Sequence, residues 1–240
     1  TGRDLETFAR RIPRMVRWVS SFGAQSVPRS DQVKIVDWPA DLGLLAERYG
    51  LNESGFRQYI PRSDASSIDD WIEASQAYQA TLLRRQIETL RRLKYKPTGG
   101  FTFSALADCR PAISMAIFDH DRQPKQAVAA VQAACQSIIV VADRLPIQMH
   151  PGQAVLLDVH VVSDEREPLQ DLDVTAQLSW PDGQHDWAWR GQIDADSVAR
   201  IGSINWIAPN VTGPVDLTLQ LRHRGDEVAS NTYRGAIRAD

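Results

Sequence analysis

The sequence predicts an α/β unit over residues 1–135 followed by an all-β unit over residues 136–240. Apolar residues recur at helical spacing or in short runs in the first part, and they alternate with polar residues in the second. Residues 1–135 contain 19 Lys and Arg against 15 Asp and Glu, whereas residues 136–240 contain 8 against 15. A change of period and of charge at one point indicates two structural units.

Composition excludes several classes of protein. Of the 240 residues, 43% are hydrophobic and 24% are charged, with a net charge of -3, which excludes wholesale disorder. The longest apolar runs, such as residues 137–142, are far shorter than the roughly 20 residues that cross a bilayer, so we expect no membrane partner. The sequence has no polybasic block, which argues against nucleic acid as a partner.

The sequence predicts neither a metal nor a cofactor. The five histidines are scattered without the spacing of a metal site, and neither a glycine-rich phosphate loop nor a Gly-x-Ser-x-Gly elbow occurs. The two cysteines, Cys109 and Cys135, cannot build a disulfide framework, and we expect buried thiols in preference to a bridge between them. The chain begins at Thr1 inside a charged helical pattern without a signal peptide, which indicates a fragment or processed product, and we favour the cytoplasm as its compartment.

The N-terminal region alternates short helices with an apolar run. Pro13 ends the first helical pattern, and Gly50 and Pro61 end two later ones. The apolar run is compatible with a buried parallel strand, although its pattern alone does not exclude a helix. The predicted elements are a helix over residues 3–11, a strand over 15–19, and helices over 41–49 and 53–60.

The clearest single element is a helix over residues 69–94. Ser67 and Asp70 form a start that resembles a capping box, and Leu83, Ile87 and Leu90 follow on one face. Its arginines are interpreted as a solvated face in preference to a nucleic-acid patch, because Glu88 interrupts them and no aromatic residues interleave with them.

A second apolar stretch and a final helix complete the first unit. Pro97, Gly99 and Gly100 precede the stretch at residues 101–106, and a helix is predicted over residues 124–135. This order of strand, helix, strand and helix is typical of a parallel α/β fold.

The second unit reads as an antiparallel β-sandwich of immunoglobulin-like type. Three segments alternate with period two, residues 155–162, 174–179 and 215–222, and turn signals such as Pro181-Asp182-Gly183 separate them. Six or seven such strands in about 100 residues are typical of this architecture. Trp187 and Trp189 share one face of a strand, where a place in the sandwich core or at a domain interface is favoured over stacking on a sugar ring.

Two loops are the candidate site. Residues 20–25 follow the first predicted strand and residues 107–111 follow the second, and in a parallel barrel the carboxyl ends of strands face the ligand. Asp108 is the only carboxylate there, and we favour a structural or hydroxyl-binding role for it over catalysis. Ser20, Ser21 and Ser26 have no convincing histidine partner, so none of them is predicted to be an activated nucleophile.

These loops carry motifs that resemble a known family. Residues 17–28 read Arg-Trp-Val-Ser-Ser-Phe-Gly-Ala-Gln-Ser-Val-Pro, and residues 107–114 read Ala-Asp-Cys-Arg-Pro-Ala-Ile-Ser, with Gly99-Gly100 before them and Phe118-Asp119 and Pro124-Lys125 after. The first segment is similar to the surroundings of the nucleophile in glycoside hydrolase family 2, especially its β-mannosidase-like branch. The second resembles the eighth-strand motif of that branch.

The resemblance implies that residues 1–135 are the C-terminal portion of a (β/α)8 TIM barrel, about strands and helices seven and eight. Residues 136–240 would be the immunoglobulin-like domain that follows. The remainder of the barrel would come from another chain or a longer precursor, because a partial barrel leaves strand edges uncovered. The implied ligand is a carbohydrate, a β-glycoside. Ser21 would occupy the nucleophile position, and the implied substrate-binding residues are Phe22, Phe103, Ser104, Asp108 and Arg110.

The sequence also departs from that family. Its members carry Ser-Glu-Phe/Tyr-Gly with Glu as the nucleophile, and that position is Ser21 here. The motif Trp-Gln-Leu-Asn-Asp-Cys-Trp-Pro is replaced by residues 104–111, Ser-Ala-Leu-Ala-Asp-Cys-Arg-Pro. A retaining glycosidase needs two carboxylates about 5–5.5 Å apart, and this chain supplies neither.

Two functions therefore stay open. The complete protein hydrolyses terminal β-glycosides, or it is a catalytically inactive relative that acts in carbohydrate binding or assembly. An engineered replacement of the nucleophile is disfavoured because the eighth-strand motif is altered as well.

Overall fold

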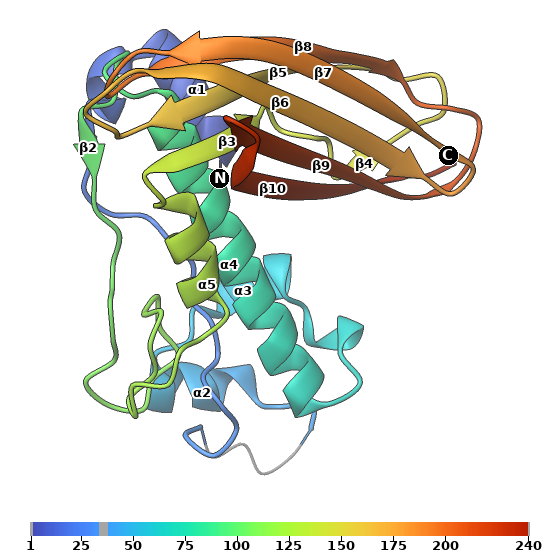
Figure 1. Cartoon of the computed structure of the whole chain (residues 1–240). Coiled ribbons are helices and arrows are strands. Elements are labelled where there is room, and N and C mark those ends of the chain that lie inside the picture. Colours follow the sequence, from blue (N-terminus) through green and yellow to red (C-terminus); the bar gives the residue numbers. More distant parts are fainter. Residues whose placement is uncertain (1, 34–37, 240) are drawn as a thin grey trace. The chain divides into compact units, whose positions relative to one another are not determined.

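The computed structural model describes residues 2–33 and 38–239, and the chain divides into two compact units, Thr1–Cys135 and Gln136–Asp240 (Figure 1). The fold is mixed and rich in strands, with several sheets. Each unit has its own hydrophobic clusters.

The first unit contains all the described helices and one pair of short strands. In chain order its elements are α1 (Gly2–Arg11), the 3-10 helix η1 (Pro13–Val16), β1 (Trp18–Val19), α2 (Leu42–Tyr49), α3 (Glu53–Tyr59), the 3-10 helix η2 (Arg62–Asp64), α4 (Ile68–Arg92), β2 (Gly100–Phe101) and α5 (Ala127–Ala134). The helices predicted over 41–49, 53–60 and 69–94 are confirmed to within two residues at each end.

Local side chains explain where these helices begin and end. The Asp41 carboxylate accepts hydrogen bonds from the backbone N–H groups of Gly43 and Leu44, at 2.8 and 3.2 Å, and starts α2. Gly50 ends α2 in the left-handed region, with φ +78°, where a side chain would be strained. Ser67 Oγ accepts from the N–H of Asp70 at 3.1 Å and starts α4.

The two strands of this unit are shorter than the apolar runs that predict them. Residues 13–16 form a 3-10 helix because Pro13 presets its first turn, and only two residues on each strand pair. Trp18 pairs with Gly100 and Val19 with Phe101, in parallel. Within the described ranges neither strand has a second partner, so nothing extends the ladder further along the two runs.

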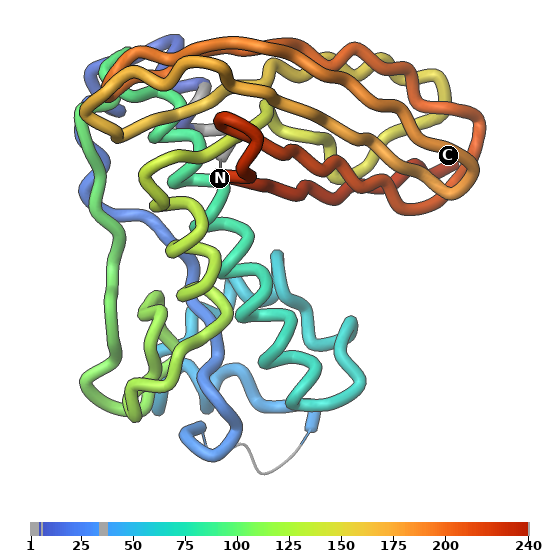
Figure 2. The backbone as a smooth tube through the Cα atoms, in the orientation of Figure 1, coloured from blue at the N-terminus to red at the C-terminus, as the bar shows by residue number. Residues whose placement is uncertain are grey.

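Helix α4 buries its predicted apolar face against this pair of strands. Leu83, Ile87 and Leu90 are at most 1% exposed, and they cluster with Val19 of β1 and Phe101 of β2. The chain segments that leave β1 and β2 then run past α4 toward α2 (Figure 2). A second cluster surrounds Trp71, whose ring N–H donates to the Ile60 carbonyl at 3.1 Å and so fastens the loop after α3.

The second unit contains eight described strands, where six or seven were expected. They are β3 (Ile138–Ala142), β4 (Gln148–Met149), β5 (Ala154–Ser163), β6 (Leu169–Trp180), β7 (Gly183–Ile193), β8 (Val198–Ile207), β9 (Gly213–His223) and β10 (Asp226–Ile237). With only two residues, β4 is too short to show a period in the sequence.

Two sheets pack face to face in this unit. The five-stranded sheet has the order β4-β10-β9-β6-β7 and the three-stranded sheet the order β3-β5-β8. All pairings are antiparallel except that of β4 with β10. Alternate residues of β5, from Val155 to Val161, are buried with those of β6 and β9 in one cluster, which confirms the predicted period of two.

Two further expectations concern single side chains. Trp187 and Trp189 are partly buried against the core of the second unit, as the favoured interpretation holds. The expectation of buried thiols is wrong: Cys109, in the loop after β2, and Cys135, directly after α5, are both exposed, and no disulfide joins them.

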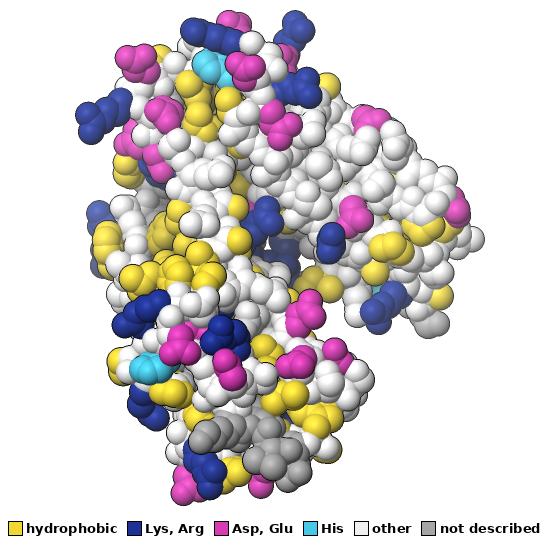
Figure 3. All heavy atoms as spheres, turned by 60° about the horizontal axis from the view of Figure 1, so that its bottom comes forward, with side chains coloured by type: hydrophobic (Ala, Val, Ile, Leu, Met, Phe, Trp, Pro, Cys, Tyr) yellow, Lys and Arg dark blue, Asp and Glu magenta, His cyan; other side chains and the backbone are white. Residues whose placement is uncertain are grey.

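Charged side chains of both signs are interspersed on the face shown in Figure 3. Among the described residues, no helix is long and apolar enough to cross a membrane.

Candidate functional site

Ser21 and Ser104 lie side by side where β1 and β2 have ended. Their hydroxyl oxygens are 3.4 Å apart although 83 residues separate them in sequence. Thr102 Oγ1 donates to the Ser20 carbonyl at 2.7 Å and ties the two chain segments together just before the serines. The structure thus places the loop at residues 20–25 beside Ser104, which lies at the end of the second apolar stretch, three residues before the loop at 107–111 that was selected from the sequence. We name residues 20–26 the first loop and residues 104–118 the second loop.

The serine pair offers hydroxyl groups and no activated nucleophile. Across the part of the chain that the structure describes, neither hydroxyl is hydrogen-bonded to a histidine or a carboxylate. A serine needs an adjacent base to attack a substrate. Each hydroxyl can still donate and accept hydrogen bonds, which suits a polyhydroxylated ligand.

Phe22 and Phe103 lie beneath the serines. Phe22 is 8% exposed, and its ring centroid lies 5.9 Å from that of Phe101 and 6.3 Å from that of Phe103. Both rings pack against the cluster that includes Leu83. This aromatic packing supports the backbone that presents Ser21 and Ser104.

Asp108 is buried and bound by its own loop. Its Oδ1 accepts from Ser114 Oγ at 2.6 Å, its Oδ2 lies 3.6 Å from Lys125 Nζ, and its carbonyl accepts from Arg122 at 2.7 Å. These contacts fold residues 108–125 back on themselves. These contacts hold the loop together, and the preference for a structural or hydroxyl-binding role of Asp108 over catalysis stays a prediction.

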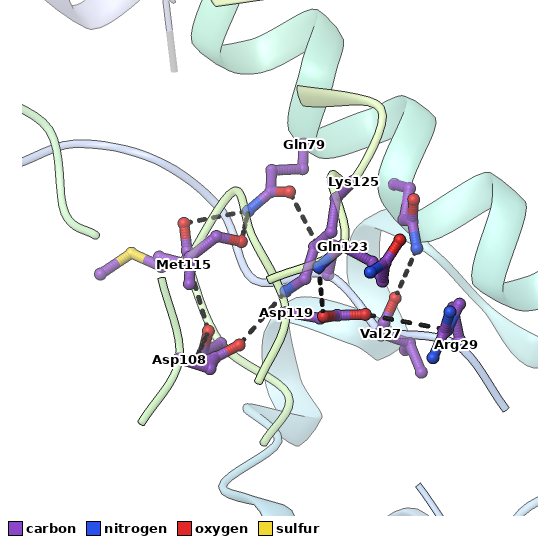
Figure 4. A network of polar contacts seen from close by, with 12 residues as sticks. Val27, Arg29, Gln79, Asp108, Met115, Asp119, Gln123 and Lys125 are labelled. Carbon is purple, nitrogen blue, oxygen red and sulfur yellow. Dashed lines mark hydrogen bonds and ion pairs between the residues drawn. The ribbon is translucent and has the colours of Figure 1, made fainter. Parts of the chain in front are cut away.

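Lys125 is the cation at the centre of this polar network (Figure 4). Its side chain is 2% exposed, and burial lowers its pKa while the neighbouring Asp108 and Asp119 carboxylates act against that shift. Asp119 accepts from the backbone N–H of Gln123 at 2.8 Å and lies 3.9 Å from Arg29 Nε. The network therefore links the second loop to the segment after the first.

Arg110 lies on the exposed part of the second loop. Its Nη1 is 3.5 Å from the carbonyl of Arg48, in the last turn of α2. It is thus attached to α2, and it makes no described hydrogen bond to Ser21 or Ser104.

A cavity of about 290 Å³ lies behind the first loop. It is lined by Gly23, Ala24 and Gln25 of that loop, by α3, by Tyr78 and Leu82 of α4, and by Met115 of the second loop. The Gln25 side chain is already engaged, since it donates to the Gly50 carbonyl and accepts from the N–H of Asn52. Among the described residues, no group of three or more His, Cys, Asp or Glu could hold a metal ion.

Gln79 is not among the site residues predicted from the sequence. This residue lies in α4 and is fully buried, and its amide is hydrogen-bonded to both loops of the candidate site. Gln79, Leu83 and Ile87 follow at spacings of four on the buried face of α4. The sequence did contain a signal for this residue, because Gln79 is a polar residue on the apolar face of the helix.

Comparison with known proteins shows the fold. The chain matches no protein-family profile and no curated protein. It is similar to the crystal structure of a β-D-mannosidase from Dictyoglomus thermophilum, with a TM-score of 0.70 and 19% identity over 95% of this chain and 28% of that chain. It is also similar to the exo-chitosanase CsxA from Amycolatopsis orientalis, with a TM-score of 0.67 and 14% identity over 90% of this chain and 27% of that chain.

These likenesses are consistent with the C-terminal region of a family 2 glycoside hydrolase, the family that the loop motifs resemble. The chain spans little more than a quarter of the length of either neighbour. A further similar structure concerns the inhibition of CsxA, which is described there as an exo-β-D-glucosaminidase. The inhibitor is a glucosamine-configured castanospermine.

Proposed function

We propose that residues 1–135 are the C-terminal portion of a (β/α)8 barrel and that residues 136–240 are an immunoglobulin-like sandwich. The order β1, α4, β2, α5 with parallel strands supports the first assignment. Two mostly antiparallel sheets around one core support the second. The remaining strands of the barrel are supplied by another chain or by a longer precursor.

The exposed surface around the strand pair supports that last point. Parallel sheets occur almost only where both faces are covered. Here the side chain of Trp18 on β1 is 59% exposed, and that of Leu106 after β2 is 66% exposed. Further strands would cover both residues.

The proposed function is that of a glycoside hydrolase-like protein whose ligand is a terminal β-glycoside. One observation carries it: the hydroxyls of Ser21 and Ser104 meet 3.4 Å apart beyond the strand pair of a fold shared with a β-mannosidase. Ser21 and Ser104 contact hydroxyl groups of the sugar, whereas Phe22, Phe103 and Asp108 support the loops that carry them. Hydrolysis by the complete protein requires carboxylates from outside this chain.

The site also favours a second candidate, a catalytically inactive relative that binds carbohydrate. A serine at the nucleophile position cannot form the glycosyl ester through which a retaining enzyme works. The adjacent Ser104 adds a second neutral hydroxyl and no charge.

Ligand-observed NMR on the full chain tests the carbohydrate site. We expect saturation transfer to methyl β-D-mannoside or methyl β-D-glucosaminide, and its loss in the double variant Ser21→Ala with Ser104→Ala. The matched control is Ser230→Ala, an exposed serine on β10, which should bind as the parent does. Absence of transfer in the parent, or equal transfer in all three proteins, would contradict the proposal.

The two candidates are separated by the coding sequence upstream of Thr1. An Asn-Glu pair at the end of an earlier barrel strand supports the hydrolase, because that pair supplies the general acid/base in the family. A barrel sequence without it supports the inactive relative.

A further inference from the structure

Gln79 connects the two loops of the candidate site through one buried side-chain amide. Its Nε2 donates to the Ala24 carbonyl of the first loop at 3.0 Å and to the Met115 carbonyl of the second at 3.0 Å, with the Ala116 carbonyl at 3.3 Å (Figure 4). Its Oε1 accepts from Ser26 Oγ at 2.8 Å. We infer that Gln79 is the positioning residue that holds the Ser21 and Ser104 loops in one arrangement, which rests on the proposed carbohydrate site.

The orientation of the amide is fixed by its partners. Backbone carbonyls only accept hydrogen bonds, so the nitrogen of Gln79 must face Ala24 and Met115 and its oxygen must face the Ser26 hydroxyl. The side chain therefore uses its donors and its acceptor at once. No other residue type of similar length provides two donors and an acceptor without a charge.

Only a few backbone residues separate the carbonyls bound by Gln79 from the two serines. On the first loop, Ala24 is three residues after Ser21. On the second loop, the N–H of Ile117, next to Ala116, donates to the Ala105 carbonyl at 3.2 Å, and Ala105 directly follows Ser104. A shift of either loop at Gln79 is thus transmitted to the serine pair.

The loops also contact each other beside the amide. Between the loops, the N–H of Ser26 donates to the Ser114 carbonyl at 2.9 Å, and within the second loop the N–H of Ala116 donates to Ser114 Oγ at 2.9 Å. Both N–H groups lie within two residues of an atom bonded to Gln79. The hydrogen exchange of the Ser26 amide therefore reports on the link between the loops, and that of the Ala116 amide reports on the fold of the second loop where Gln79 holds it.

Helix α4 offers a matched control in Gln86. This glutamine is 7% exposed on the same helix, and it is hydrogen-bonded to neither loop within the described part of the chain. A change to methionine has nearly the same shape and removes the same polar groups at both positions. Only Gln79→Met breaks a connection between the loops.

The experiment compares hydrogen exchange and sugar binding in the full chain, Gln79→Met and Gln86→Met. We expect the exchange of the Ser26 and Ala116 amides to become at least about tenfold faster in Gln79→Met, with the rest of α4 unchanged. Saturation transfer to methyl β-D-mannoside should be lost in this variant. Gln86→Met should keep the parent's exchange in both loops and its binding.

Three results would overturn the inference: faster exchange in one loop only, a uniform increase over the whole first unit, or the same increase in Gln86→Met. If Gln79→Met does not fold, Gln79→Glu replaces it. The carboxylate of that variant places oxygens against the backbone carbonyls at neutral pH, and it regains one donor when it is protonated in acid. Loop protection that is lower at pH 7 than in acid supports the inference, and protection equal to the parent at both contradicts it.

The exchange measurement needs no ligand. A parent protein that binds no sugar but loses loop protection in Gln79→Met would refute the proposed function and leave the role of Gln79 intact. A parent that binds sugar equally with and without Gln79 would refute the positioning role alone.

Discussion

Serine at position 21 changes what the site can do chemically. A carboxylate there would be charged and ready to attack a sugar carbon, whereas the Ser21 hydroxyl is neutral and has only Ser104 beside it. Two hydroxyls can recognise a sugar through exchangeable hydrogen bonds, but they cannot stabilise a cationic transition state. At the proposed site Ser21 therefore supplies hydrogen bonds and no attacking group.

Replacing Ser21 tests that conclusion in an assay of nitrophenol release from aryl β-mannosides. We expect the full chain and Ser21→Ala to show the same residual rate, because an unactivated hydroxyl contributes nothing to the reaction. Ser21→Glu should give weak activity at most, since it restores one carboxylate of the two that are needed. A substantial parent rate that Ser21→Ala abolishes would make Ser21 catalytic.

The carboxylate of Asp158 on β5 gives a second prediction for a single residue. Hydrogen bonds from Ser203 Oγ, at 2.6 Å, and then from Arg200 lower the pKa of Asp158 below its ordinary 3.8. A carboxylate with a lowered pKa stabilises the folded state above pH 3.8, and this contribution is lost as the pH falls through 3.8 toward the folded-state pKa. Ser203→Ala should thus cost about 1 kcal/mol in free energy of unfolding at neutral pH and less in acid.

Urea unfolding of the parent and Ser203→Ala at several pH values measures that difference. Ser197→Ala is the control, because the Ser197 hydroxyl donates to the Asp194 carbonyl and touches no carboxylate. A loss in Ser203→Ala that is the same at every pH would contradict the assignment.

Elements with local start and stop signals were predictable from the sequence, and those that depend on distant partners were not. Asp41, Gly50 and Ser67 act on backbone groups within a few residues, so the limits of α2 and α4 could be predicted closely. The lengths of β1 and β2 depend on which strands lie beside them, which the apolar runs do not reveal. The sheets of the second unit were predictable because β5, β6 and β9 alternate along their own length.

The candidate site was partly predictable for the same reason. The loop at residues 20–25 was selected for its position after the first strand, and it lies beside Ser104, just ahead of the loop selected at 107–111. The contacts of Asp108 with Ser114 and Lys125 depend on how the second loop folds back, and that cannot be derived from spacing. Gln79 lies in α4, which stands between the two loops in the sequence, and its side chain connects them. The only sign of this role in the sequence is that a polar residue occupies the apolar face of the helix.

Substitutions at two glycines test this explanation of where the helices begin and end. Gly50 has φ +78° and open space around it, so Gly50→Ala adds only backbone strain and should destabilise the first unit by about 1 kcal/mol. Gly55 lies in the first turn of α3, where an added Cβ makes ordinary contacts, and Gly55→Ala should stabilise it by about 0.5 kcal/mol. Denaturation followed by the helical circular dichroism signal measures both, and equal effects of one sign would refute the account.

The two units differ in the extent of the sheets that they contain. The second unit surrounds its core with two sheets, and the buried residues come from most of its strands. Within the described residues of the first unit, the only sheet is a two-residue parallel pair. A parallel pair of this length supplies too few hydrogen bonds and too little covered surface to be stable alone.

Separate expression of the two units tests this difference. We expect residues 136–240 to be a soluble monomer with a cooperative thermal transition, because burial of its core does not depend on strands that are missing from its sheets. Residues 1–135 should aggregate or unfold without cooperativity, since the surface around β1 and β2 requires further strands. Calorimetry and light scattering measure both properties, with the 240-residue chain as the reference. A soluble, monomeric 1–135 with a sharp transition would show that the strand pair needs no further strands, and the proposal of a barrel completed from elsewhere would then be wrong.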